Sequence, residues 1–297
     1  FKQKTAYEIR LSLVGSEMCI RDSPIYLSEI PEPPKNLHIR GALPPIGSIY
    51  LTIVGSRKYT SYGKDACEMF IEGLRGYPIV IVSGLALGID TIAHRAAMRA
   101  GLKTVAFPGS GLSNKVLYPS SNRNLADTII ENGGCLLSEF EPEQAAAIWT
   151  FPRRNRLMAG IAKAVLIVEA EDKSGTRITA RLATEYNRDV LVVPGSIFSP
   201  VSRGTNSLIR LGATPITTAK ELLDALGFTG EISAGINREL VNCSEEERTI
   251  LELIREPIQR DELIRALAKP TSETNSILTV LEIKGLIKEE MGEIRRV

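Results

Sequence analysis

The stretch YLTIVGSRKYTSYG (residues 50–63) joins an apolar run, a glycine turn and the start of a helical pattern. Further apolar runs follow along the chain: PIVIVS (78–83), KTVAF (103–107), CLLSEF (135–140), AVLIVEA (164–170) and DVLVVP (189–194). Helical patterns alternate with them at 61–75, 89–100, 122–132, 177–187, 205–211 and 218–227. Nearly continuous apolar strands are typical of a parallel sheet covered by helices on both faces. The alternation therefore predicts an α/β domain with a doubly wound parallel sheet over residues 46–229.

The character of the sequence changes after this domain. Residues 230–243 are a linker containing Gly, Ser and Asn, and residues 244–297 contain three short helical patterns and a hairpin that turns at 291–292. Ser244 and Glu247 occupy the two positions of a helix-capping box. Short helices followed by a hairpin in a segment of this size are typical of a winged helix. We therefore expect a small winged-helix domain at 244–297.

The N-terminal region is expected to stand apart from both domains. Residues 24–45 form a proline-rich, extended lead-in. Before it, KQKTAYE (2–8) and LVGSEMCIRD (13–22) resemble the translation of common sequencing-adapter DNA. We interpret residues 1–23 as an adapter-derived, non-native segment and leave them out of the functional argument. A natural N-terminal helix is the alternative, and resequencing the locus without that adapter distinguishes the two.

The composition argues against several classes of function. The chain of 297 residues has no uninterrupted apolar run of the roughly 18 residues that a membrane span requires. Its four cysteines lack CxxC spacing and it holds only two histidines, so the sequence indicates no zinc site, disulfide framework or Ser-His-Asp triad. We expect a cytoplasmic protein with no membrane partner, no metal and no cofactor.

The net charge of +1 conceals an uneven distribution of charge. Residues 44–243 hold 21 Lys+Arg against 18 Asp+Glu, whereas residues 244–297 hold 9 against 12. The expected recognition helix, 273–284, has Lys284 as its only cation. Because duplex-binding winged helices bring basic residues to phosphates, this one is expected to serve protein contacts or regulation instead.

Glycine- and hydroxyl-rich turns follow four of the expected strands: GSRKYTSYG (55–63), SGLALGID (83–90), PGSGLS (108–113) and PGSIFSPVSRGTN (194–206). The carboxyl ends of parallel strands form one edge of a sheet, where ligands bind. Glycine permits a close backbone approach, and hydroxyls and helix N-terminal amides bind phosphate oxygens. The four turns together predict a phosphate-binding site, although any single one could be an ordinary tight turn. A GxGxxG motif is absent, which argues against a dinucleotide site.

Cations and aromatic residues are expected at the same edge. Arg57 and Lys58 follow the first strand, and FPRRNR (151–156) precedes the fifth. Arginines beside aromatic rings suit the phosphates and stacked bases of a single nucleic-acid strand. A solvated basic loop is the alternative for 151–156, and Asn155 either caps the following helix or contacts a base. SGTRITA (174–180) is a helix start with hydroxyls and a further candidate phosphate contact.

Four other polar residues are interpreted as structural. Asp90 is expected to cap a helix N-terminus, and His94 is expected to be packed or hydrogen-bonded on the same helix. Glu139 and Glu169 end strands, where they either hold loops by accepting backbone N–H bonds or act as acids. The structural role is favoured for both, because no partner base can be identified.

The order and spacing of these motifs over residues 50 to about 227 resemble the DNA-processing protein A (DprA/Smf) family. The resemblance implies an extended Rossmann-like fold that binds single-stranded DNA without sequence preference. It also implies a homodimer that loads a RecA-type recombinase onto this DNA in natural transformation and recombination, without catalytic turnover. Residues 244–297 resemble the winged helix of many members. Many members also have an N-terminal helical domain, of which residues 24–45 would be the tail.

The turns and the resemblance together give one set of candidate DNA-binding residues. These are Gly55, Ser56, Arg57, Lys58, Ser83, Gly84, Gly88, Gly109, Ser110, Gly111, Phe151, Arg153, Arg154, Asn155, Arg156, Ser174, Gly175 and Thr176. The three arginines of 151–156 are expected at the rim of the site, and residues 208–226 are a candidate dimer surface.

Two other functions fit the same fold. A phosphoribohydrolase would use a PGGxGTxxE motif, but the nearest stretches, SGTRITA and PGS (194–196), lack the glutamate at that spacing. A sensor that binds a small nucleotide and signals through the winged helix is the other alternative.

Overall fold

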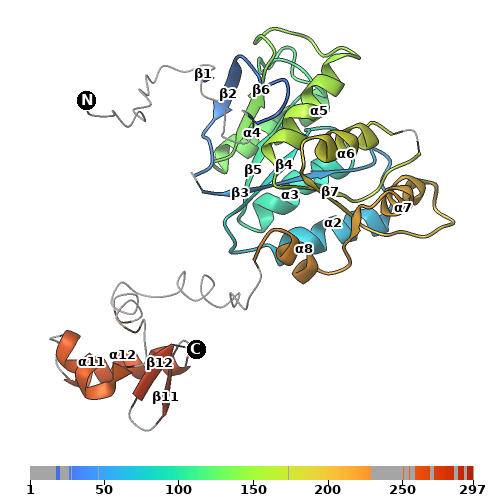
Figure 1. The fold of residues 1–297 in the computed structure, drawn as a ribbon. Helices are drawn as coiled ribbons and strands as arrows, with labels where there is room; N and C mark the ends of the chain where they lie inside the picture. Colours follow the sequence, from blue (N-terminus) through green and yellow to red (C-terminus); the bar gives the residue numbers. More distant parts are fainter. Residues whose placement is uncertain are drawn as a thin grey trace, which may run out of the picture. The chain divides into compact units, whose positions relative to one another are not determined.

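The computed structural model describes residues 18–20, 27, 29–45, 47–172, 174–228, 250, 254, 258–267, 271–283, 287–290 and 293–296. It divides into two compact units, Phe1–Gly227 and Phe228–Val297, which are described separately (Figure 1). Three expectations fall outside the described residues: the linker at 230–243, the cap formed by Ser244 and Glu247, and most of the adapter-like segment (1–17 and 21–23). Lys284 also lies outside them.

The first unit is built on a nine-stranded sheet with the order β1-β2-β6-β5-β4-β3-β7-β8-β9. Its strands are β1 (Met18–Ile20), β2 (Leu37–Gly41), β3 (Ile49–Val54), β4 (Ile79–Ser83), β5 (Lys103–Ala106), β6 (Cys135–Ser138), β7 (Ala164–Ile167), β8 (Asp189–Val192) and β9 (Thr214–Pro215). All neighbours from β6 to β9 pair in parallel, whereas β1 and β2 are antiparallel. The predicted doubly wound α/β fold is confirmed.

The strand order places a topological switch point beside β3. The chain runs outward from β3 through β4 and β5 to β6, and then returns to place β7 on the other side of β3. The connections from β3 and from β7 therefore diverge, and their turns leave a crevice at the carboxyl ends of the two strands. Ligands of open parallel sheets bind at such a crevice.

Helices cover both faces of this sheet. They are α2 (Ser61–Gly73), α3 (Ile89–Arg99), α4 (Arg123–Glu131), α5 (Thr150–Ile161), α6 (Thr176–Glu185), α7 (Arg203–Arg210) and α8 (Ala219–Ala225), with short 3-10 turns at Ser120–Asn122 and Pro200–Ser202. Helices α2, α3 and α8 pack together on one side and α5 and α6 on the other (Figure 1). The strands between them are buried on both faces; every residue of β4 and β7 is buried.

Three features of this unit were not anticipated from the sequence. The lead-in contains β2, which adds an antiparallel strand beside β6, and β1 falls within the segment interpreted as adapter-derived. The FPRRNR stretch is not a loop but the first half of α5. Pro152 is tolerated there because a helix leaves its first backbone N–H groups without intrahelical acceptors. The second half of α5 buries Leu157, Met158 and Ile161 against the sheet.

The second unit is a small helical domain with a three-stranded sheet. It contains α11 (Arg260–Leu267), α12 (Thr271–Ile283) and the strands β10 (Ile258–Gln259), β11 (Ile287–Glu290) and β12 (Glu293–Arg296). Antiparallel pairing of β11 with β12 confirms the predicted hairpin. The core of this unit consists of Ile250, Ile254, Leu263, Leu278, Leu281, Ile287 and Ile294.

Candidate functional site

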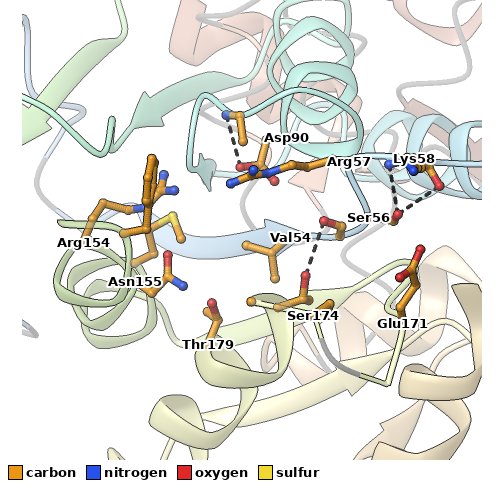
Figure 2. A pocket seen from close by; sticks show the side chains of 16 residues that line it. Val54, Ser56, Arg57, Lys58, Asp90, Arg154, Asn155, Glu171, Ser174 and Thr179 are labelled. Atoms are coloured by element: carbon orange, nitrogen blue, oxygen red, sulfur yellow. Dashed lines mark hydrogen bonds between the residues drawn. The ribbon is translucent and has the colours of Figure 1, made fainter. Parts of the chain in front are cut away.

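A cleft of about 430 Å³ opens at the switch point, at the carboxyl ends of β3, β4 and β7 (Figure 2). Its lining residues are 54–58, Ala86, Asp90, Phe151, Arg154, Asn155, Met158, Glu171, 174–176 and Thr179. We call it the first cleft. Arg57 and Lys58 lie on one side of it, and Ser174 and Thr179 lie on the facing side (Figure 2).

The loop after β3 supplies the exposed cations of the first cleft. Ser56 is buried, and its hydroxyl donates to the carbonyl of Lys58 (2.9 Å) while accepting from the Lys58 amide (3.0 Å). This pair of bonds closes a turn that leaves Arg57 and Lys58 exposed. The Arg57 guanidinium lies 5.8 Å from the centre of the Phe151 ring, within the range of a cation–π interaction. The site thus combines exposed positive charge with an aromatic face.

Gly88 lets the turn after β4 pack directly against this loop. Its φ is +84°, a conformation that favours glycine, and a Cβ atom there would lie 2.3 Å from the carbonyl oxygen of Ser56. Gly88 therefore positions the loop that carries Arg57. Gly55 has the same kind of role, because a Cβ atom there would lie 2.7 Å from the side chain of Ile89.

The start of α6 forms the facing side of the cleft. Ser174 and Gly175 precede α6, and the Thr176 hydroxyl donates to the carbonyl of Gly55 (3.3 Å), which joins the β7 turn to the β3 turn. The Ser174 hydroxyl oxygen is buried without a hydrogen-bond partner among the described residues. The positive end of a helix and an unpaired hydroxyl are suited to an anionic ligand.

Only one of the three predicted rim arginines is exposed. Arg153 has a side chain 55% exposed, 3.4 Å from Glu139 and 5.9 Å from the centre of the Trp149 ring, and it does not line the cleft. Arg154 is 5% exposed and donates to the carbonyls of Gly84 and Phe107, so it forms a wall of the cleft. Arg156 is 7% exposed, pairs with Glu139 and donates to the carbonyl of Glu32, and it does not line the cleft. All three were predicted at the rim because the sequence does not show which carbonyl and carboxylate groups the arginines contact.

The remaining predicted residues divide between lining and support. Asn155 lines the cleft from within α5 and therefore does not cap that helix. Ser83 and Ser110 are buried; Ser83 donates to the carbonyl of Ile53 (2.7 Å) and Ser110 to that of Gly111 (3.0 Å).

Three predicted glycines mainly give room to their neighbours. A Cβ atom at Gly84 would lie 2.0 Å from the Arg154 guanidinium, and one at Gly109 would lie 2.6 Å from the Phe151 ring. Gly111 packs against the backbone of residues 141–142. Phe151 in turn meets Tyr118 edge-on, with ring centres 5.8 Å apart. These glycines shape the aromatic wall of the site.

Four titratable residues have structural contacts, but Asp90 does not cap a helix N-terminus as expected: Gly88 is the N-cap of α3, and Asp90 lies in the first turn of that helix. Asp90 accepts from the amides of Gly84 (3.1 Å) and Ala86 (3.3 Å), and burial raises its pKa against the opposing effect of the Arg154 guanidinium. Glu169 accepts from the amide and the hydroxyl of Thr60. Glu139 pairs with Arg153 and Arg156.

His94 is fully buried and stays neutral. The Thr104 hydroxyl donates to the carbonyl of Ile81 (2.8 Å), so it accepts from Nδ1 of His94 (2.7 Å). Burial, and secondly the charge of Arg154, lower the pKa of His94 to about 3. His94 is therefore uncharged at physiological pH.

Six lining residues were not among the predicted site residues: Val54, Ala86, Asp90, Met158, Glu171 and Thr179. Thr179 lies one helical turn beyond Thr176, and the i, i+3 spacing on α6 is the signal that could have identified it. Glu171 follows β7 and adds an exposed carboxylate on the same side of the cleft as Ser174 (Figure 2). Among the described residues, no group of three or more His, Cys, Asp or Glu could hold a metal ion. No helix in the described part of the chain is long and apolar enough to cross a membrane.

The fold defines a Rossmann-like α/β protein with a cleft at its switch point, lined by exposed cations and the start of a helix. The family model described as DNA recombination-mediator protein A matches residues 18–227, and that of the DprA winged helix domain matches residues 238–293. The chain belongs to the DNA recombination-mediator protein A family. The expected winged helix is thereby confirmed.

Curated relatives agree with this assignment. Protein Smf of Escherichia coli K12 is 40% identical over 195 residues, which are 66% of this chain and 52% of that protein. The chain thus spans about half the length of this relative. DNA processing protein DprA of Streptococcus pneumoniae R6 is 41% identical over 202 residues, 68% of this chain and 70% of that protein.

Two solved structures share the fold. That of DprA from Streptococcus pneumoniae has a TM-score of 0.66 and 40% identity, and covers 70% of this chain and 73% of its own. That of DprA from Helicobacter pylori has a TM-score of 0.64 and 30% identity, and covers 71% of this chain and 96% of its own. The second structure is described as showing a single-stranded DNA binding mode of that protein.

Proposed function

We propose that the first cleft binds the backbone of single-stranded DNA without sequence preference. The observation that carries the proposal is the contact of the exposed Arg57 guanidinium with the Phe151 ring, next to exposed Lys58, in a cleft that also contains the start of α6. Single-strand binding proteins combine a cationic groove with aromatic faces in this way. The Helicobacter pylori relative, whose chain is matched over 96% of its length, supports the same ligand.

The residues divide into three roles in this proposal. Arg57 and Lys58 contact phosphates from exposed positions in the cleft, and Arg153 attracts the strand from an exposed position outside the lining. Ser174, Gly175 and Thr176 offer hydroxyl and amide donors. Phe151 offers a ring to a base. The buried residues of the predicted set support these contacts. They are Ser56, Ser83, Gly84, Gly88, Gly109, Ser110, Gly111, Arg154, Asn155 and Arg156.

The biological role that we propose is loading of a RecA-type recombinase onto the bound strand, in natural transformation and recombination. The protein acts as a cytoplasmic homodimer and binds its strand without chemical turnover. Membership of a family of recombination mediators supports the loading role. Leu211, 73% exposed at the end of α7, gives the candidate dimer region 208–226 an accessible apolar side chain.

The affinity for single-stranded DNA is expected to fall steeply with salt concentration. Each neutralised phosphate releases counterions, and log K falls with log salt by roughly 0.7 for every phosphate contacted on a single strand. Fluorescence anisotropy with a labelled oligonucleotide over a series of salt concentrations measures this slope. A slope near zero would contradict phosphate binding.

In the same preparation, recombinase filaments should form faster on strands already bound by this protein, and nucleoside monophosphates should release no free base.

Duplex DNA is expected to bind much more weakly than a single strand. The described part of the winged-helix unit carries Glu262, Glu282 and Glu289 beside its cations, and residues 244–297 hold 12 Asp+Glu against 9 Lys+Arg. A like-charged surface repels the duplex backbone. Competition of unlabelled duplex against a bound labelled strand, with the full chain at physiological salt, tests this. Comparable affinity for the two would overturn the view that this domain serves protein contacts.

A further inference from the structure

A second cleft of about 540 Å³ lies at the same edge of the sheet, beside the first. Its lining residues are Thr60, Tyr62, Glu169, Pro194, Gly195, Ser196, Ser199 and Ser202. They come from the loop after β3 with the first turn of α2, from the residues just after β7, and from the loop and 3-10 turn after β8. The first two segments also line the first cleft, so the clefts are neighbours, displaced along the sheet by one strand, roughly 4.8 Å.

The two clefts differ in charge. Arg57, Lys58 and Arg154 line the first, whereas no Lys or Arg among the described residues lines the second. The second cleft instead contains the carboxyl group of Glu169, which is 2% exposed and bonded to Thr60. A phosphate would meet a buried like charge there without a compensating cation. Hydroxyl groups with donor and acceptor capacity suit a neutral, polar ligand such as a nucleobase edge.

An unpaired aromatic ring stands next to the second cleft. Phe198 is 87% exposed, on the loop after β8 that supplies Pro194, Gly195, Ser196 and Ser199 to the lining. This exposure is large for a phenylalanine, since aromatic rings normally bury most of their area. A free ring beside a hydrogen-bonding cleft is the arrangement that binds a base by its face and its edge together.

The loop that carries Phe198 is held by hydrogen bonds. The Ser199 amide donates to the carbonyl of Ser196 (3.0 Å), and the Phe198 amide donates to the Ser196 hydroxyl (3.2 Å). The Tyr62 hydroxyl donates to the carbonyl of Pro194 (2.6 Å), which ties the loop to the start of α2. Phe198 is therefore exposed on an ordered turn, so little entropy is lost when a ligand contacts it.

We propose that the second cleft binds a nucleobase of the same DNA strand whose phosphate lies in the first cleft, and that Phe198 stacks on this base. The inference rests on the proposed function and extends it from the backbone to the base. The strand then crosses the sheet edge from β3 towards β8. Its phosphate lies in the cationic first cleft and its base lies in the hydroxyl-lined second cleft. Because every base has a π-face, the contact is tolerant of sequence.

Replacing the ring tests the proposal directly. Phe198→Ala is expected to weaken binding of single-stranded DNA by about 5- to 150-fold, the range for losing one base–aromatic stack. Phe198→Trp keeps an aromatic ring at this position, so its affinity should equal that of the unmodified protein. Ile197→Ala is the matched control, since Ile197 is 76% exposed on the same loop and has no π-face; its affinity should equal that of the unmodified protein.

The salt dependence separates this contact from the phosphate site. Phe198→Ala should leave the slope of log K against log salt unchanged, because no phosphate contact is lost, whereas Arg57→Ala should reduce the slope by roughly 0.7. An oligonucleotide with abasic sites along its length should bind the unmodified protein and Phe198→Ala equally. If the salt slope and the Arg57 effect are present while Phe198→Ala binds normally, the proposed function stands and the second-cleft proposal fails.

A spectroscopic measurement completes the test. Trp149 is the only tryptophan, so the double variant Trp149→Phe/Phe198→Trp carries a single indole at position 198. Stacking on a base should quench its fluorescence when oligonucleotide is added, and inorganic phosphate should not. Absence of quenching, or an effect of Phe198→Ala on dimerisation or recombinase recruitment with unchanged DNA affinity, would overturn the proposal and mark the loop as a protein contact.

Discussion

Arg57→Glu is expected to abolish binding of single-stranded DNA while the fold persists. Arg57 is exposed at the mouth of the first cleft, where its guanidinium faces Phe151 at 5.8 Å. A hydrogen bond to a charged group contributes roughly 1.5–3 kcal/mol, and reversal adds repulsion of the phosphate, so the affinity should fall by about 100-fold or more. Fluorescence anisotropy measures the affinity, and thermal unfolding followed by circular dichroism checks the fold.

Arg95→Glu is the matched control for this variant. Arg95 is exposed on α3, lines neither cleft and undergoes the same change of charge. Its affinity should change only through the weak long-range field, which salt screens. Retained affinity in Arg57→Glu would reject the first cleft as the DNA site. An equal loss in both variants would show that net charge, rather than this cleft, governs binding.

Arg154→Ala is expected to destabilise the fold rather than to remove a DNA contact selectively. The side chain is buried and donates to the carbonyls of Gly84 and Phe107. Burial lowers the pKa of Arg154 to about 10, which still leaves it cationic beside buried Asp90 at neutral pH. Without the guanidinium, the two carbonyls lose their hydrogen-bond donor and the buried carboxyl group of Asp90 loses its neighbouring cation. The free energy of unfolding should therefore fall by about 3–5 kcal/mol. Urea denaturation measures this loss.

Arg153→Ala gives the opposite pattern and serves as the comparison. Its side chain is 55% exposed, so the free energy of unfolding should change by no more than about 0.5 kcal/mol, while the affinity for single-stranded DNA falls. A variant Arg154→Ala that unfolds like the unmodified protein but fails to bind DNA would show that this guanidinium is itself a ligand contact.

The edge of the sheet could be predicted from the sequence because its signals are local. Each strand is a short apolar run, and a turn such as 55–63 carries its glycine, hydroxyls and cations within a few residues of the strand. Parallel pairing then brings the turns to one edge whatever the details of packing. The resemblance of the motifs to a family added the ligand class, which spacing alone does not identify.

The roles of Arg154 and Arg156 could not be predicted because their partners are distant in the sequence. The carbonyls that Arg154 contacts are 70 and 47 residues away, and the one that Arg156 contacts is 124 residues away. In sequence, a cation that binds phosphate and one that satisfies buried carbonyls look the same. Helix α5 was missed for a related reason, because its first half is polar and its apolar face begins only at Leu157.

The hydrogen bonds of Arg154 join the turn after β4, the end of β5 and α5 within one wall. A cleft whose walls are fastened together before a ligand arrives loses little conformational entropy on binding. Charge then governs how often a strand meets the protein, and the fit inside the cleft governs how long the strand stays. In the proposed function, one nucleotide would replace the next without rearrangement of this wall, which suits the proposed role of holding a strand and then passing it on.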